Sequence, residues 1–324
     1  MLVSVLLFAV GLVLLIKGGD WFVDGATGIA KRFNLPDIVV GATVVSIGTT
    51  LPEVMVSTAG ALAGSGAMAY GNAIGSIICN TALIAAISIT CNPGPVNVKS
   101  MKTPVIFFFA SAAMYCLASY LMGEFPRWLG FVMLSVFVVY TLLTVRNGLR
   151  NPDAAAEEEE EEGKPKKLWQ ELLLLVAGAA VIAVGADLLV DHGQIIAKEL
   201  GVPETVIALL FVALGTSLPE LVTTITSLKK GRASLGVGNV IGANVFNLVL
   251  VSGVAVSLAP FEVPCENFLL DTGLNMSLVF EIPVMLGVMS LMTIPALLTK
   301  KLGRWQGITL LCIYAAFCVC QFVL

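Results

Sequence analysis

Two copies of one short motif carry the side chains of this chain that could do chemistry. Residues 48–53 read GTTLPE and residues 215–220 read GTSLPE, and each copy lies within a long apolar stretch. The last residue of each copy is a carboxylate, Glu53 or Glu220. A charged side chain inside a bilayer is costly and is kept mainly where it lines a path for ions or protons. The repeated motif therefore predicts a cation transporter whose two glutamates share one site.

Spacing within the motif predicts an oxygen-rich cation site. The threonine four residues before each glutamate, Thr49 or Thr216, lies on the same helical face as the carboxylate. The proline before each glutamate has no N–H, so the carbonyl of the motif's glycine loses its helical partner. Carboxylate, hydroxyl and carbonyl oxygens together suit hard cations such as Ca²⁺ or Na⁺. Two carboxylates balance one divalent cation, or two to three monovalent ones with some residual charge, which is the electrostatic basis of exchange.

A second repeated motif follows the first in each half, at 71–80 and at 238–247. Its glycines, spaced four residues apart, permit close approach of helices. Its last residue is an asparagine in both copies, Asn80 and Asn247, which we expect to supply neutral oxygen ligands or to hold the glutamates. The alternative is a hydrogen bond between helices away from the ion. The asparagine in second place of each copy is expected to support the ligands rather than to bind the ion.

Composition places the chain in the membrane. It has 324 residues and a mean hydropathy of +0.94, with 57% hydrophobic and only 12% charged residues. A soluble domain is about half apolar and about a quarter charged. The seven cysteines show no paired spacing that would indicate a disulfide framework. We therefore predict an all-α integral membrane protein in contact with the lipid bilayer. We predict no enzymatic activity, no resident cofactor and no nucleic-acid partner.

Apolar stretches of spanning length predict about ten transmembrane helices. The first is long and contains a glycine pair, Gly18 and Gly19, which we expect to loosen it. The ten expected spans are 1–33, 37–63, 69–92, 102–122, 126–146, 168–198, 203–228, 233–258, 282–299 and 303–323.

Charge in the loops predicts the orientation. If both termini lie outside, all of the 18 lysines and arginines except Arg127 and Lys198 fall on the inner side. The positive-inside rule expects such a bias. The polar segment 147–167, which contains a run of glutamates and then several lysines, is predicted to be a solvated cytoplasmic linker.

The two halves repeat one unit. Subtracting 53 from 220 gives 167, and this offset aligns a long stretch of the chain without a gap. With five spans in each half, the second copy must enter the membrane from the opposite side. Inverted repeats with interrupted helices near the midplane are a recurring architecture of secondary transporters. We therefore divide the chain into a first inverted repeat at 1–146, the linker at 147–167 and a second inverted repeat at 168–324.

Together, the paired GT[ST]LPE and GNxxGxxxxxN motifs in two inverted halves closely resemble the sodium/calcium exchanger superfamily, over essentially the whole chain. The resemblance implies Na⁺-driven exchange of Ca²⁺ by alternating access, in a prokaryotic plasma membrane and by a monomer. It implies that Ca²⁺ is bound by the two glutamates and by the carbonyls of the motif's first threonines. The residues that it maps onto the Ca²⁺ and Na⁺ sites, or onto their lining, are Glu53, Glu220, Thr49, Thr216, Ser46, Ala213, Ser76, Thr50 and Ser217.

This chain departs from the family pattern at two positions. Asn247 stands where several members, including the K⁺-dependent branch, have an aspartate, so the resemblance does not imply K⁺ coupling. Ala243 replaces a serine whose hydroxyl contributes to one Na⁺ site, so it does not imply three Na⁺ ions per Ca²⁺ either.

Two other functions use the same motifs. A proton/Ca²⁺ antiporter, or one for another divalent cation, would have the glutamates carry protons alternately. A cation channel would use them at a constriction, although channels favour rings of identical subunits. The aspartates at the ends of the long first helices of the two halves are expected to be interfacial or capping, with a cation-attracting vestibule as the alternative. Glu281, before Pro283, is expected to cap the start of a helix.

Overall fold

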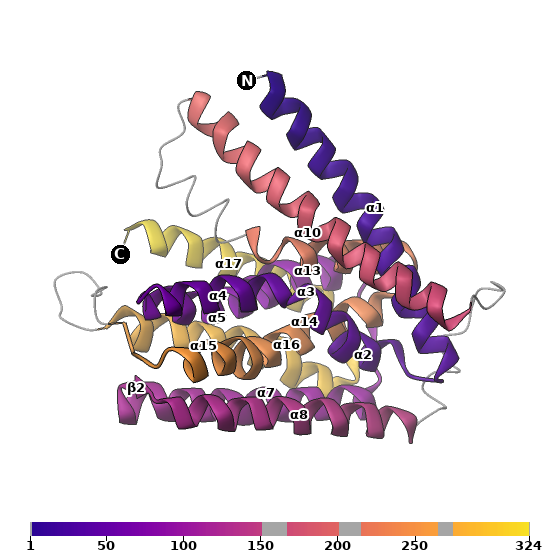
Figure 1. Cartoon of the computed structure of the whole chain (residues 1–324). Coiled ribbons are helices and arrows are strands. Elements are labelled where there is room, and N and C mark those ends of the chain that lie inside the picture. Colours follow the sequence, from indigo (N-terminus) through magenta and orange to yellow (C-terminus); the bar gives the residue numbers. More distant parts are fainter. Residues whose placement is uncertain (1, 151–166, 201–214, 265–274, 324) are drawn as a thin grey trace.

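A computed structural model describes residues 2–150, 167–200, 215–264 and 275–323 of the chain (Figure 1). The first half contains α1 Leu2–Arg32, α2 Asp37–Val40, the π-helical η1 Gly41–Val45, α3 Ser46–Thr49, α4 Leu51–Leu62, α5 Gly66–Cys79, η2 Asn80–Ala85, α6 Ala86–Cys91, β1 Gly94–Pro95, α7 Val98–Leu117, η3 Ala118–Met122, β2 Glu124–Phe125 and α8 Arg127–Leu149. The second half contains α10 Leu168–Glu199, α13 Leu218–Lys229, α14 Ala233–Phe246, η5 Asn247–Val251, α15 Ser252–Leu258, β3 Phe261–Glu262, η7 Ser277–Glu281, α16 Ile282–Thr299, β4 Lys301–Leu302 and α17 Arg304–Val323.

The fold is that of an all-α integral membrane protein. In the described ranges, seven helices are long and apolar enough to cross a membrane, or eight if the bent pair at 37–62 counts as one span. This number is compatible with the ten spans that the sequence predicts. The first part of the expected span at 203–228 lies outside the described residues. Most of the linker at 147–167 also lies outside them.

Several elements of the two halves correspond residue for residue. The bounds of α4 and α13, of α5 and α14, and of β1 and β3 are each 167 residues apart, the offset of the sequence repeat. The strands also pair across the halves, because β1 is antiparallel to β4 and β2 is antiparallel to β3. Each pair thus joins one strand of the first half to one strand of the second half, and the two pairs are equivalent under the repeat. The local structure therefore has the two-fold relation that inverted repeats require.

The helices α1 and α10 run side by side across the other helices (Figure 1). Glycines line their contact. A Cβ on Gly11 would lie 2.9 Å from the Gly185 carbonyl oxygen, and one on Gly18 would lie 2.9 Å from the Ile182 nitrogen. The expectation that Gly18 and Gly19 loosen the first span is wrong, because α1 is one continuous helix from Leu2 to Arg32. The glycines allow close packing instead.

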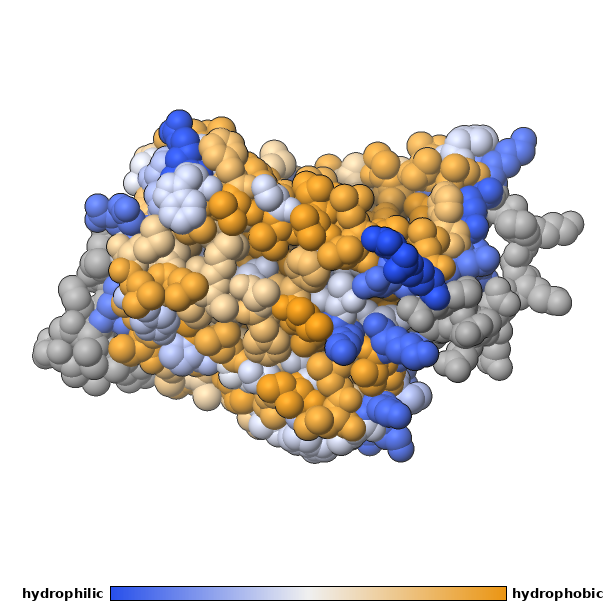
Figure 2. Space-filling view, turned by 90° about the horizontal axis from the view of Figure 1, so that it is seen from below, coloured by the Kyte–Doolittle hydropathy of each residue, from blue (hydrophilic) through white to orange (hydrophobic). Residues whose placement is uncertain are grey.

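Burial separates a central helix from peripheral ones. In an 18-residue stretch of the span that α14, η5 and α15 form, 83% of the residues are buried, whereas only 28% are buried in such a stretch of α8. Large apolar side chains of the outer helices, such as Phe131 and Leu142 on α8, are exposed. Figure 2 shows one face of the molecule as mainly apolar, with hydrophilic residues gathered toward its two ends. This distribution is the one expected of a protein surrounded by lipid.

One helix start differs from its prediction. Glu281 was expected to cap a span at 282–299, but the helical segment already begins at Ser277, with η7. The Glu281 carboxylate accepts hydrogen bonds from the Ser277 hydroxyl at 2.8 Å and from Gln321 Nε2 at 3.2 Å. It therefore joins η7 to α17 and does not cap a helix.

Candidate functional site

The first motif breaks a helix in the first half, and in the second half it directly precedes the start of a helix. In the first half of the chain, α3 ends at Thr49 and α4 begins at Leu51. The segments before and after this break are bent by 45° relative to each other. Thr50, between them, has φ −85° and ψ −1°, and its repeat counterpart Ser217 has φ −90° and ψ 5° just before α13. The proline in second place of α4 and of α13 is tolerated there because the first N–H groups of a helix lack internal partners. The break that the sequence predicts is therefore present at the motif.

Each motif glutamate lies in the first turn of the helix that follows the break. Glu53 is the third residue of α4 and Glu220 is the third residue of α13. The N-terminal end of a helix stabilises a nearby negative charge by about 0.3–1 kcal/mol, or more where the site is partly buried. The local fold thus favours carboxylates at these two positions.

The two carboxyls come together in the protein interior. Glu53 and Glu220 are both fully buried, and they belong to motifs that meet in the interior. The hydroxyl of Thr50, from the first half, lies 3.5 Å from Oε1 of Glu220, from the second half. Both oxygens of Glu53 and Oε2 of Glu220 have no hydrogen-bond partner within the described part of the chain. Such a buried pair requires a cation or protons for neutralisation.

Asparagines of the second motif hold hydroxyls of the first. The Thr49 hydroxyl donates to Oδ1 of Asn239 at 3.1 Å, and the Ser46 hydroxyl lies 3.2 Å from the same oxygen. In the repeat-related contact, the Thr216 hydroxyl donates to Oδ1 of Asn72 at 3.4 Å. These bonds join the two halves in both directions. Support of ion ligands by the asparagine in second place stays a prediction, and these bonds are compatible with it.

Asn80 and Asn247 lie at equivalent irregularities of their helices. Each is the first residue of a π-helical segment, η2 or η5, and each is fully buried. The oxygen and nitrogen of both side chains lack partners among the described residues. The interhelical hydrogen bond that the sequence offered as an alternative is therefore not seen there. π-Helical turns are frequent at functional sites because they turn side chains and carbonyls out of the regular pattern.

The remaining predicted site residues divide into two groups. Ser76 and Ser217 are buried, and their hydroxyls are without partners in the described ranges. Ala213, the repeat counterpart of Ser46, lies outside the described residues. In the described part, no group of three or more His, Cys, Asp or Glu side chains could hold a metal ion. Any cation between the glutamates would thus depend on hydroxyl, amide and carbonyl oxygens for its other ligands.

A polar cluster around Asn244 was not predicted from the sequence. Nδ2 of Asn244 donates to the Thr81 hydroxyl at 2.7 Å and lies 3.2 Å from the Met289 sulfur. Asn244 has no polar counterpart in the first half, where Ile77 stands. That inequality of the repeats was visible in the sequence, but the partners were not, because they come from two other helices.

Comparisons with known proteins point to one family. The family model described as sodium/calcium exchanger protein matches residues 3–146 and 171–323. The chain is 30% identical to the sodium/calcium exchanger MaX1 of Methanosarcina acetivorans, over 99% of both chains. It is 34% identical to an uncharacterized membrane protein of Methanocaldococcus jannaschii, over 95% of this chain and 94% of the relative. Among solved structures, it is similar to the sodium-calcium exchanger NCX_Mj, soaked with Na⁺ and Sr²⁺, with a TM-score of 0.78, 31% identity and 97% of each chain covered.

Proposed function

We propose, from the premise that this chain belongs to the sodium/calcium exchanger family, that it exchanges Na⁺ for Ca²⁺ across the membrane. Glu53 and Glu220 bind the cations in turn, and the pocket opens alternately to the two sides of the membrane. The named relative and the solved structure are sodium/calcium exchangers, which supports the choice of ions. Membership of an exchanger family also favours a transporter over the channel that the sequence left open.

One observation carries the proposal. Two fully buried carboxyls from opposite halves lie together, and three of their four oxygens lack a partner in the described ranges. The Thr50 hydroxyl lies 3.5 Å from Glu220, and hydroxyl and amide oxygens are ligands that hard cations accept. One Ca²⁺ neutralises both carboxylates, and Na⁺ ions can replace it, so either cargo makes burial favourable. An empty, doubly charged pocket is costly inside the membrane, which couples entry of one cargo to exit of the other.

Ca²⁺ release from loaded vesicles tests the proposal. We expect purified protein in proteoliposomes to release internal Ca²⁺ when Na⁺ is added outside, but not when choline is added. Glu53→Gln and Glu220→Gln each remove one charge and should abolish release. Glu262→Gln, a carboxylate on β3, is the matched control and should transport normally. Release by choline and Na⁺ alike would contradict exchange.

A proton/Ca²⁺ antiporter is the second candidate, because protons would also neutralise the Glu53 carboxylate, whose oxygens have no hydrogen-bond partner among the described residues. The same vesicles distinguish the two. A pH step without Na⁺ would release Ca²⁺ if protons are the counter-ion, and would release little if Na⁺ is.

A further inference from the structure

Two repeat-equivalent helix contacts differ in the structure. On one side, α1 packs closely on α13, so that a Cβ on Gly19 would lie 2.7 Å from Cγ1 of Val222. The repeat counterparts of Gly19 and Val222, 167 positions away in the sequence, are Ala186 of α10 and Met55 of α4. Those two residues instead line a cavity of about 420 Å³, and Met55 is 71% exposed. The contact between α1 and α13 is therefore closed, and its equivalent is open.

The open side leads to the motif. Its cavity is lined by Pro52 and Pro219, which directly precede the two glutamates, and by Thr216. Asp187 and Asp191 of α10 also line it. Their repeat counterparts on the closed side are Asp20 and Asp24 of α1. The same pair of acids thus faces a cavity in one half and a packed contact in the other.

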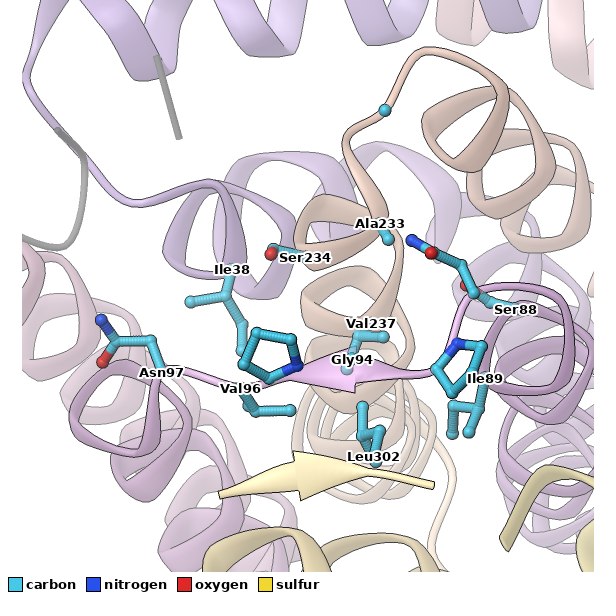
Figure 3. A pocket seen from close by; sticks show the side chains of 14 residues that line it. Ile38, Ser88, Ile89, Gly94, Val96, Asn97, Ala233, Ser234, Val237 and Leu302 are labelled. Atoms are coloured by element: carbon cyan, nitrogen blue, oxygen red, sulfur yellow. The ribbon is translucent and has the colours of Figure 1, made fainter. Parts of the chain in front are cut away.

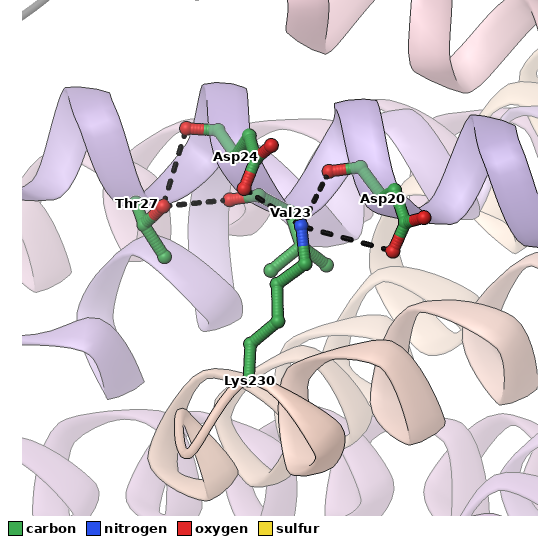
Figure 4. Close-up of polar contacts among 5 residues, drawn as sticks. All are labelled: Asp20, Val23, Asp24, Thr27 and Lys230. Carbon is green, nitrogen blue, oxygen red and sulfur yellow. Dashed lines mark hydrogen bonds and ion pairs between the residues drawn. The ribbon is translucent and has the colours of Figure 1, made fainter. Parts of the chain in front are cut away.

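A lysine occupies the closed side (Figure 4). Nζ of Lys230, just after α13, lies 2.7 Å from Oδ1 of Asp24 and 3.8 Å from Oδ1 of Asp20. It also donates to the backbone carbonyl of Asp20 at 2.9 Å. One ammonium therefore ties the end of α13 to two successive turns of α1. The repeat counterpart of Lys230 is Ala63 (230 − 167 = 63), which can form no ion pair with Asp187 or Asp191.

A second cation acts on the same side. Nη1 of Arg232 lies 3.1 Å from Oδ2 of Asp37, at the start of α2, and Ser65 stands at the equivalent position of the other half. The cations of the loop after α13 thus bind α1 and α2, whereas the loop after α4 has small neutral residues. In a transporter built from inverted repeats, such an inequality favours one of two otherwise equivalent states.

The closed side also contains buried hydroxyls on α13. Thr223 and Ser227 follow Glu220 by one and two helical turns on α13, and their hydroxyls lack partners among the described residues. The equivalent positions on α4 are Val56 and Gly60. After α13, Gly231 and Ser234 line a pocket of about 250 Å³ together with polar residues near β1 (Figure 3). Hydroxyls without partners are expected along a path that hydrates when the contact opens.

We propose that Lys230 is a positioning residue that holds α1 against α13, so that the resting protein exposes the glutamate pair through the cavity between α10 and α4. The proposal rests on the function proposed above. Because the sequence places Lys230 on the cytoplasmic side, the favoured state faces outward. The ion pairs are partly exposed, so their loss should raise the population of the opposite state by about two- to fivefold.

Cysteine labelling at the two equivalent positions tests this role. In a variant whose seven native cysteines are replaced, Val222→Cys reports opening of the α1–α13 contact and Met55→Cys reports the cavity. Both are labelled in detergent micelles without Na⁺ or Ca²⁺, using a hydrophilic maleimide. We expect Lys230→Met to speed labelling of Val222→Cys by about two- to fivefold and not to speed labelling of Met55→Cys.

Matched variants separate the ion pair from general loosening. Lys229→Met removes the exposed neighbouring charge and should leave labelling unchanged. Lys230→Arg, and the exchange Lys230→Asp with Asp24→Lys, should restore slow labelling. Equal rates in Lys230→Met and the parent, or equal acceleration by Lys229→Met, would overturn the proposal.

Hydrogen exchange of the protein with its native cysteines gives a second reading. Segment 222–229 should exchange faster in Lys230→Met than in Lys229→Met, and equal rates would again overturn the proposal. Neither measurement needs transport. A labelling shift without Na⁺-driven Ca²⁺ release would keep the role of Lys230 and reject the proposed ions, and the reverse result would reject only the role of Lys230.

Discussion

Asn239 shows how much of this pocket depends on a residue that need not touch the ion. Its side-chain oxygen accepts a hydrogen bond from Thr49 and lies within reach of Ser46, both from the other half of the chain. Without that acceptor, the two hydroxyls would be free to turn away from the glutamates. Loss of a group that orients metal ligands typically costs about 10–100-fold in affinity.

We therefore expect Asn239→Ala to raise the half-saturating Ca²⁺ concentration by about tenfold or more. Uptake by proteoliposomes over a range of Ca²⁺ concentrations measures this. Ser111→Ala, which removes a buried hydroxyl from α7, is the control and should change little. Equal half-saturation in Asn239→Ala and the parent would show that Asn239 does not orient the ligands.

Residue types in the first motif were enough to predict a functional role for its side chains. Buried carboxylates have few explanations in a membrane, so chemistry alone predicts a shared site for Glu53 and Glu220, and both side chains are buried. The partners of Asn239 and Asn244 did not follow, because they depend on which helices cross. The ion pair of Lys230 could not be predicted from the sequence either. A lysine in a basic loop carries no signal of its partner, and Asp24 lies 206 residues away in the sequence.

At the scale of helices, hydropathy predicted the spans, and proline predicted the break at the motif. The π-helical segments could not be predicted, because a single extra residue in a helical turn leaves no trace in apolar periodicity. The sequence does not predict the role of the glycines in α1, for a related reason. Gly18 has the same sequence signature whether it loosens a helix or admits a neighbour, and only the position of α10 decides between them.

Two glycines offer a test of close packing between α1 and α10. A Cβ on Gly178 would lie 2.5 Å from the backbone nitrogen of Phe22, whereas one on Gly287 of α16 would meet no described heavy atom within 4 Å. We expect Gly178→Ala to destabilise the protein by about 1–3 kcal/mol, because the helices must separate. Gly287→Ala should be neutral or stabilising by about 0.5–1 kcal/mol. Thermal unfolding in detergent measures both, and a common direction of change would contradict the packing.

At the scale of the whole molecule, the halves are packed into each other along their length. A Cβ on Gly242 would lie 2.6 Å from Cα of Ala42, and one on Gly130 of α8 would lie 2.9 Å from the carbonyl oxygen of Gly253. The strand pairs β1–β4 and β2–β3 add contacts between the halves at two further places. Within the described part of the chain, these contacts hold the two repeats together.

The linker should therefore be dispensable once the protein has folded. We expect a chain with a protease site in place of the glutamate run Glu157–Glu162 to keep Na⁺-driven Ca²⁺ release after complete cleavage. The two fragments should elute together in detergent. Their separation would expose the close glycine contacts and the buried glutamates to solvent. The uncleaved chain is the control for the inserted site. Fragments that separate, or activity lost in proportion to cleavage, would show instead that residues 147–167 hold the repeats in register.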